Sequence, residues 1–184
     1  MQTFVGVDQA LRKIGVAVIQ GGGVALMKLI LPPPHLRSTE RMLYLREALQ
    51  HALEPFPEAD GAALEGQSYG SAGQLDQLGR IGGIVELLLA DLYGKPPLVV
   101  PPATLKKFVT GSGQATKSLM MRATKVYWDV ETDQDDLCDA HGLARLASEF
   151  YTPESIIRHQ CEAVHSLRHK KVRRRIRAVF PKSL

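Results

Sequence analysis

An α/β fold with a mixed five-stranded sheet flanked by helices is predicted from the order of the apolar segments along this 184-residue chain. Three strand-like segments come first, and the turns between them are short enough to form two antiparallel hairpins. Two further strands each follow a helical segment, and right-handed crossovers of that kind would lay them parallel to the first strand. The predicted strands cover residues 3–8, 14–19, 24–31, 60–65 and 98–100.

Apolar residues recur at helical spacing between and after these strands, as in the row from Met42 to Leu53. Ser38 and Asp133 stand where N-cap residues are expected at two helix starts. The predicted helices cover residues 38–55, 74–93, about 105–108, 116–128 and 133–151, and another helix leads from residue 152 into the C-terminal tail.

The composition is that of one globular domain, because 45% of the residues are hydrophobic and the length suits a single core. No apolar run approaches the ~20 residues that cross a membrane, and the start lacks the pattern of a signal peptide. The two cysteines, Cys138 and Cys161, make neither a disulfide framework nor a metal-binding spacing. We therefore expect a protein of a reducing cytoplasm, either bacterial or that of an infected host.

Charge is unevenly distributed along the chain. Residues 158–184 contain nine Lys and Arg and one acid, Glu162, so this stretch carries +8 and residues 1–157 carry −4. We expect one globular domain over residues 1–157 and a basic extension over 158–184. A basic extension favours a polyanionic partner such as nucleic acid, although a solubilising tail has the same composition.

Four carboxylates are candidates for a shared metal site. Asp8 and Glu65 end two strands that should be parallel neighbours, and Asp136 and Asp139 share one face of a helix at i, i+3 spacing. Asp135, at i, i+4 from Asp139, is an alternative to Asp136. Neighbouring carboxylates repel unless a cation neutralises them, and oxygen ligands suit Mg²⁺ or Mn²⁺. Taken alone, Asp8 is equally consistent with an ordinary strand end, and Asp133 and Asp135 with helix capping.

Several short motifs occur together in one order: Val5–Asp8 with Gly15–Ile19, Ala63–Glu65, Leu78–Gly83, Leu105–Lys107 with Gly111–Ser118, and Asp136–Ala140. In that order and near those spacings, they resemble the RuvC-type Holliday junction resolvases of the RNase H-like (retroviral integrase) superfamily. The resemblance covers residues 4 to about 147.

The resemblance implies an RNase H-like fold and a homodimeric endonuclease that nicks two opposed strands of a four-way DNA junction. The nicks would carry 5′-phosphate and 3′-hydroxyl ends. It also implies two Mg²⁺ ions per active site, for which Mn²⁺ can substitute. By matched position the catalytic residues would be Asp8, Glu65, Asp136 and Asp139 as metal ligands, with Lys106 and Lys117 near the scissile phosphate.

Other residues are candidates for DNA contact. The resemblance implies an aromatic residue in the loop after Glu65, and Tyr69 stands there, although this loop is about one residue shorter than the family pattern. Arg12 and Lys13 make the first hairpin basic, and Lys107 could take the place of Lys106. In the tail, an amphipathic basic helix is expected to lie along a DNA arm through Arg173, Arg174 and Arg175.

Three further features complete the comparison with the family. Gly79, Gly82 and Gly83 lie on the helix that forms the family's dimer interface, although close packing on the chain's own sheet would also favour glycine. Gln9 stands where the family often has proline. His141 lies off the face shared by the helix carboxylates, so we expect it on the helix surface.

Other functions remain open at this stage. A nuclease of the same fold could cut flaps, forks or RNA, and a catalytically silent module could bind nucleic acid. Four placed acids argue against the silent module because they would weaken DNA binding unless a metal occupied them. A phosphotransferase of the actin and sugar-kinase type would need two large lobes, for which this chain is too short.

Overall fold

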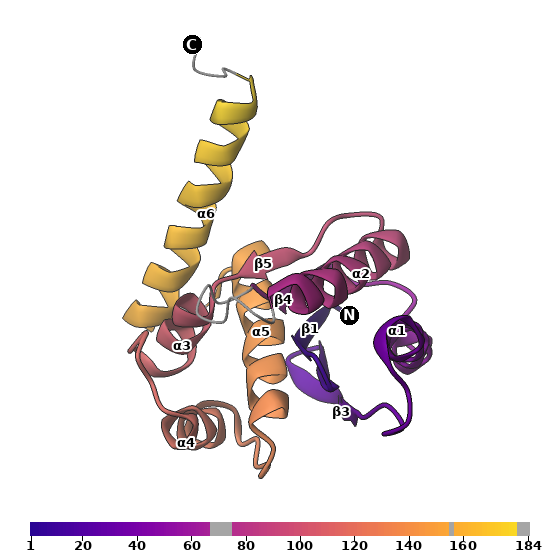
Figure 1. Ribbon diagram of the computed structural model, residues 1–184. Coiled ribbons are helices and arrows are strands. Elements are labelled where there is room, and N and C mark those ends of the chain that lie inside the picture. Colours follow the sequence, from indigo (N-terminus) through magenta and orange to yellow (C-terminus); the bar gives the residue numbers. More distant parts are fainter. Residues whose placement is uncertain (67–74, 155–156, 180–184) are drawn as a thin grey trace.

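The computed structural model describes residues 1–66, 75–154 and 157–179 (Figure 1). Tyr69 lies outside these residues. The side chains of Arg173, Arg174 and Arg175 also lie outside the description, although the backbone there belongs to a helix.

A single five-stranded sheet forms the centre of the molecule, with strand order β3-β2-β1-β4-β5. β1 pairs antiparallel with β2 and parallel with β4, while β2–β3 is antiparallel and β4–β5 parallel. The predicted mixed sheet is therefore confirmed. The strands are β1 (Thr3–Ala10), β2 (Lys13–Gln20), β3 (Gly23–Ile30), β4 (Gly61–Glu65) and β5 (Leu98–Val100).

Helices cover both faces of this sheet (Figure 1). One buried cluster joins α1 and α2 to one face, and a second joins α3 to α6 to the other face. The helices are α1 (Ser38–Leu53), α2 (Leu75–Tyr93), α3 (Pro102–Thr110), α4 (Lys117–Trp128), α5 (Asp135–Tyr151) and α6 (Arg158–Val179). In the part of the chain that the structure describes, no helix is long and apolar enough to cross a membrane.

Side-chain alternation along β1 decides which face carries its carboxylate. Val5 and Val7 are fully buried in the cluster under α1 and α2. Phe4 belongs to the opposite cluster, and Gly6 faces the backbone of α5. Since successive strand residues point to opposite faces, Asp8 lies on the α5 side of the sheet.

Two glycines let α5 lie directly on the sheet. A Cβ at Gly6 would overlap the Ala140 carbonyl oxygen, and a Cβ at Gly15 would lie 2.5 Å from the Asp136 carbonyl oxygen. Gly6 and Gly15 belong to neighbouring strands, so together they leave a side-chain-free surface on which the first half of α5 packs. This close approach brings the acidic start of α5 toward the end of β1.

Two predicted helix starts are wrong by one or two residues. Ser38 is the first residue of α1, with a positive φ of 42°, and Arg37 is the N-cap. α5 begins at Asp135 after the N-cap Gln134, so Asp133 does not cap it. Arg37 makes no side-chain capping hydrogen bond, so its place at the start of α1 leaves no signal in the sequence. The acid-rich segment before α5 contains several capping candidates, and the sequence does not rank them.

The first turns of α6 belong to the body of the molecule. Ala163, Val164 and Leu167 are buried in the cluster that contains α3 and α5. Beyond these turns the helix projects away from the body (Figure 1, yellow). The division at residue 157 that the charge distribution predicts stays a prediction.

Candidate active site

Asp8 and Glu65 are side by side at the carboxyl ends of two parallel inner strands, where their pairing stops. The last paired residues are Val7 of β1 and Leu64 of β4, and the two carboxylates follow them directly. Their side chains share a hydrogen bond. Below them, the Gln9 side-chain amide donates a hydrogen bond to the Glu65 backbone oxygen, which ties the two strand ends together.

α5 brings Asp136 and Asp139 to the same place. Asp8 is close enough to both for their negative charges to act on it, and Glu65 is affected likewise. Asp8 and Asp136 are buried, with exposed fractions of 8% and 6%. All four predicted carboxylates therefore gather between the ends of β1 and β4 and the start of α5.

Burial and mutual repulsion make this cluster hold protons more tightly than free acids do. Burial, followed by the charges of Glu65, Asp139 and Asp136, raises the pKa of Asp8 well above its usual range. Burial and the Asp139 charge raise the pKa of Glu65 to about 7. Burial, with the charges of Asp135 and Asp136, raises the pKa of Asp139 to about 6. A cation at this site would relieve both the burial of charge and the repulsion.

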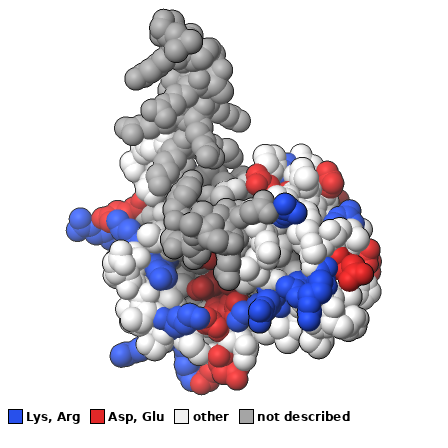
Figure 2. Space-filling model, viewed as in Figure 1, with Lys and Arg blue, Asp and Glu red and all other residues white. Residues whose placement is uncertain are grey.

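Lysines surround the cluster, and they fall into two groups. Lys13 forms an ion pair with Asp136, and Lys117 forms one with Asp135. Lys106 lies near enough for its charge to act on Glu65 and Asp139 and to oppose the rise of their pKa values. On the face shown in Figure 2, acidic side chains gather near the middle of the body and Lys and Arg side chains flank them.

Two of the predicted DNA contacts, Lys107 and Arg12, are described by an ion pair with α6 and by exposure at a hairpin tip, respectively. The Nζ of Lys107 forms an ion pair with Oε2 of Glu162 at 2.8 Å, so this side chain links α3 to α6. Arg12 is exposed at the tip of the first hairpin, so its role as a DNA contact stays a prediction. The sequence analysis did not predict the contact of Lys13 with Asp136. Strand alternation could have indicated it, because Lys13 and Gly15 lie two residues apart and point to the same face of β2.

The donor set fits a divalent cation in its chemistry. All four acids supply oxygen ligands, as Mg²⁺ and Mn²⁺ prefer. Burial, followed by the charges of neighbouring acids, raises the pKa values of Asp8, Glu65 and Asp139, and a bound cation would offset both causes. Among the residues that the structure describes, however, no three acidic, histidine or cysteine side chains already form a metal-holding group. A cation would thus have to draw the carboxylates together and compete with Lys13 for Asp136.

The raised pKa values predict that the metal-free protein loses stability as the pH rises. Between about pH 4.5 and 7 the native state keeps protons on Glu65 and Asp139 that the unfolded chain has released, so the free energy of unfolding falls with pH. We expect the Tm in EDTA to be lower at pH 8 than at pH 5, and Mg²⁺ at pH 8 to recover the difference.

His141 acts in the opposite direction, since burial lowers its pKa to about 3. A comparison with Glu65→Gln separates the two effects: this variant lacks one high-pKa carboxyl, so its Tm in EDTA should fall less between pH 5 and 8. Equal falls for the wild type and the variant would contradict the assigned proton on Glu65.

His141 itself corrects an expectation, because it is fully buried rather than on the helix surface. Its ring contacts Trp128 edge-on with centroids 5.3 Å apart, and its Nε2 accepts a hydrogen bond from Arg145 at 3.2 Å. α5 is covered by the sheet on one side and by α3 and α4 on the other. The sequence prediction assumed that this helix has one buried face and one solvent-exposed face. A helix buried on two sides has almost no exposed face, so the prediction for His141 is wrong.

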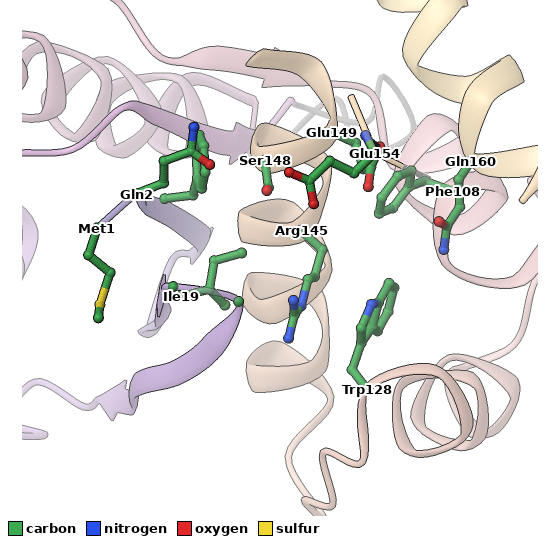
Figure 3. Close-up of a pocket in the computed structure, with 13 residues that line it drawn as sticks. Met1, Gln2, Ile19, Phe108, Trp128, Arg145, Ser148, Glu149, Glu154 and Gln160 are labelled. Carbon is green, nitrogen blue, oxygen red and sulfur yellow. Dashed lines mark hydrogen bonds between the residues drawn. The ribbon is translucent and has the colours of Figure 1, made fainter. Parts of the chain in front are cut away.

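Arg145 and Trp128 also line a cavity of about 360 Å³ that lies away from the carboxylates (Figure 3). The cavity is bordered by Met1 and Gln2 before β1 and by Ser148 and Glu149 in the second half of α5. These residues lie at the amino end of β1, whereas Asp8 lies near its carboxyl end. The cavity and the acidic cluster are therefore separate features.

Comparison with known proteins identifies the fold and one relative. A curated protein, the crossover junction endodeoxyribonuclease RuvC of Corynebacterium diphtheriae, is 28% identical over 147 residues, covering 76% of this chain and 89% of the relative. Thermus thermophilus RuvC, solved in complex with a Holliday junction substrate, superposes with a TM-score of 0.68 over 94% of this chain and 97% of that one. The chain has the RuvC fold.

The resemblance to RuvC-type proteins that the motifs predict is thus confirmed, together with the RNase H-like sheet. A second structure of Thermus thermophilus RuvC gives a TM-score of 0.65 with 93% of this chain and 97% of that chain covered. Sequence identity to the two RuvC structures is only 17% and 16%. No protein-family model matches the chain.

Proposed function

We propose that the protein is a structure-selective endodeoxyribonuclease that resolves four-way DNA junctions by paired nicks with 5′-phosphate and 3′-hydroxyl ends. One observation carries the proposal: Asp8 and Glu65, from adjacent parallel strands, meet Asp136 and Asp139 of α5 at one sheet edge. The relative in Corynebacterium diphtheriae is named a crossover junction endodeoxyribonuclease, and one RuvC structure of the same fold contains a Holliday junction substrate.

Asp8, Glu65, Asp136 and Asp139 would hold Mg²⁺, two ions per active site, with Mn²⁺ as a substitute. When bound, such ions supply an activated water and stabilise the leaving oxygen of the phosphodiester. The chain's own contribution is to orient the carboxylates through the paired strands and α5. Lys106, beside Glu65 and Asp139, would hold the scissile phosphate or offset its developing charge.

Lys117 needs a rearrangement to act in the same way. Its ammonium is bound to Asp135, but its side chain is 81% exposed, so little packing holds it there. An exposed ion pair is worth only ~0–1 kcal/mol, and a DNA phosphate could replace Asp135 as its partner. Tyr69 is proposed to stack on an unpaired base at the junction centre, as aromatic residues do on single strands.

The test of the function is cleavage by the purified protein of synthetic four-way junctions, forks, flaps and plain duplex of matched sequence. We expect symmetric nicks in the junction with Mg²⁺ or Mn²⁺, none in EDTA, and little cutting of duplex. Preferential cutting of forks or flaps would favour the alternative nuclease of the same fold. Junction binding without cutting in any of the metals would favour the silent binding module.

A homodimer through α2 is part of the proposal, because two opposed strands need two active sites. α2 has an open side: nothing in the described chain approaches within 4 Å of the position a Cβ would take at Gly83, and Leu87, one turn further, is 66% exposed. Packing on the chain's own sheet does not explain Gly83. Sedimentation equilibrium of the protein without DNA, which separates one chain from two, tests the dimer.

The basic extension is proposed to bind a DNA arm through phosphate contacts. Leu167 is buried, so a truncation should begin after it, and substitutions within the tail are cleaner still. Replacing Arg173, Arg174 and Arg175 by Gln removes three charges. The slope of log K against log salt for junction binding should then flatten by about 2.7 for each extension that contacts DNA, and by about 5 if both extensions of the dimer do, since each neutralised phosphate contributes ~0.9.

The triple Lys variant at the same positions keeps the charge and serves as the matched control, with an expected slope near that of the wild type. If the Gln variant keeps the wild-type slope, the extension is not a DNA contact. A site of action in the cytoplasm of a bacterium or infected host fits a chain with only two cysteines, Cys138 and Cys161, and no disulfide framework in its sequence.

A further inference from the structure

Lys13 reaches into the carboxylate cluster from an unexpected direction. It is the first residue of β2, paired with Ala10 across the first hairpin. Its ammonium forms an ion pair with Asp136, which lies 123 positions further along the chain. The Asp136 side chain is 8% exposed, whereas that of Lys13 is 35% exposed. The contact therefore has a buried acid on one side and a solvent-accessible cation on the other.

The fold explains why this pair forms. Lys13 and Gly15 point to the same face of β2, and Gly15 lies against the Asp136 backbone. The long lysine side chain therefore extends along the start of α5. A buried carboxylate without a partner is costly, so Lys13 stabilises Asp136 as long as no cation does.

The same pair blocks the proposed metal site. The Lys13 ammonium contacts Oδ2, one of the two carboxylate oxygens of Asp136, and its positive charge would repel a divalent cation bound to the same carboxylate. Arg12, the neighbouring residue, is exposed on the same hairpin, so a DNA strand over the cluster would meet both basic side chains. Phosphate is a good partner for an ammonium on a flexible stem.

We propose that Lys13 is an exchangeable counter-ion that pairs with Asp136 in the DNA-free protein and transfers to a backbone phosphate when branched DNA binds. This inference rests on the proposed function, because it takes Asp136 as a metal ligand. The exchange frees Asp136 for the divalent cation at the moment when substrate is present. Metal and DNA then bind cooperatively, and by linkage each raises the affinity for the other equally.

The inference predicts a gain of metal affinity from the loss of a lysine. In the DNA-free protein, Lys13→Gln leaves Asp136 without its counter-ion, so Mn²⁺ should bind about 5-fold or more tightly than to the wild type, the lower end of typical coupling between sites. Titration of Mn²⁺ alone, followed by calorimetry or by its electron paramagnetic resonance signal, measures this without cleavage. Lys13→Arg keeps the charge and should bind Mn²⁺ as the wild type does.

A second measurement tests the coupling itself. We expect Ca²⁺ to raise the affinity of the wild type for a four-way junction relative to EDTA, and to raise that of Lys13→Gln several-fold less. Arg12→Gln is the matched control for a hairpin charge without a carboxylate partner in the cluster. It should weaken junction binding but leave the DNA-free Mn²⁺ affinity unchanged.

Asp8→Asn separates failure of this inference from failure of the proposed function. If Asp8→Asn weakens Mn²⁺ binding while Lys13→Gln leaves it unchanged or weaker, the metal site stands and the counter-ion role is wrong. If Asp8→Asn has no effect on Mn²⁺, the metal site itself is wrong and the inference falls with it. Melting temperatures of all variants, measured in EDTA, verify that each is folded.

Discussion

Asp8→Asn is expected to lower metal-dependent cleavage of a four-way junction by ~10²-fold or more, while junction binding persists. The size is taken from the loss of one preorganised group that stabilises charge in the transition state, such as an oxyanion-hole donor, which typically costs ~10²–10³ in rate. Asp8 has this weight because it is buried and in contact with Glu65, at the meeting point of two strands and α5. Its amide would keep the shape of the side chain and lose the charge.

Stability distinguishes a catalytic effect of this substitution from damage to the fold. The Asp8 carboxyl is held in a site that disfavours its charged form, so a neutral amide should leave the Tm in EDTA at pH 8 unchanged or raise it. Glu47→Gln, an exposed acid on α1, is the control and should alter neither cleavage nor Tm. Undiminished cutting by Asp8→Asn under single-turnover conditions would reject the site.

The pairing of Asp8 with Glu65 could be predicted because it depends only on strand order and direction. Carboxyl ends of parallel neighbours meet at one edge, and the residue after each paired stretch is the one that faces its counterpart. Asp136 and Asp139 required one more step, the placement of α5 against this edge. This placement was predicted from the resemblance of the motif order to a known family, because strand order and direction alone do not determine where α5 packs.

The contacts of Lys13 and the burial of His141 could not be predicted in the same way. Both depend on how closely α5 approaches the sheet and on which helices cover its outer side. The glycines that permit the approach, Gly6 and Gly15, are visible in the sequence, but glycine in a strand is equally typical of a bulge. Only the structure shows that their missing side chains are replaced by the α5 backbone.

Helix starts were the least predictable feature for a local reason. The segment before α5 offers Asp133, Gln134 and Asp135 in succession, and each could cap or begin a helix. The structure uses Gln134 as N-cap, although its side chain makes no capping hydrogen bond. Asp135 is instead bound by Lys117, so tertiary contacts rather than capping preference determine what this acid does.

Gly6→Ala is the substitution expected to cost the most stability. Its methyl group would overlap the carbonyl oxygen of Ala140 and approach the backbone nitrogen of Ala144, so α5 would have to move away from β1. Overpacking of a tight core typically costs ~1–3 kcal/mol and occasionally more. We expect a value at or above the upper end here, because both obstacles are backbone atoms of a helix and neither can rotate aside.

The displacement matters for function because Gly6 and Ala140 are neighbours of the site residues on both elements. Any protein that remains folded should hold Asp139 further from Asp8, and its Mn²⁺ affinity should fall together with its Tm. Gly23→Ala, where the nearest atom lies 3.8 Å from the added methyl, is the matched control and should change neither by much. Chemical denaturation and Mn²⁺ titration of the two variants in parallel measure both effects. A Gly6→Ala protein as stable as Gly23→Ala would mean that α5 does not lie on β1 at this distance, and the carboxylate cluster would lose its structural basis.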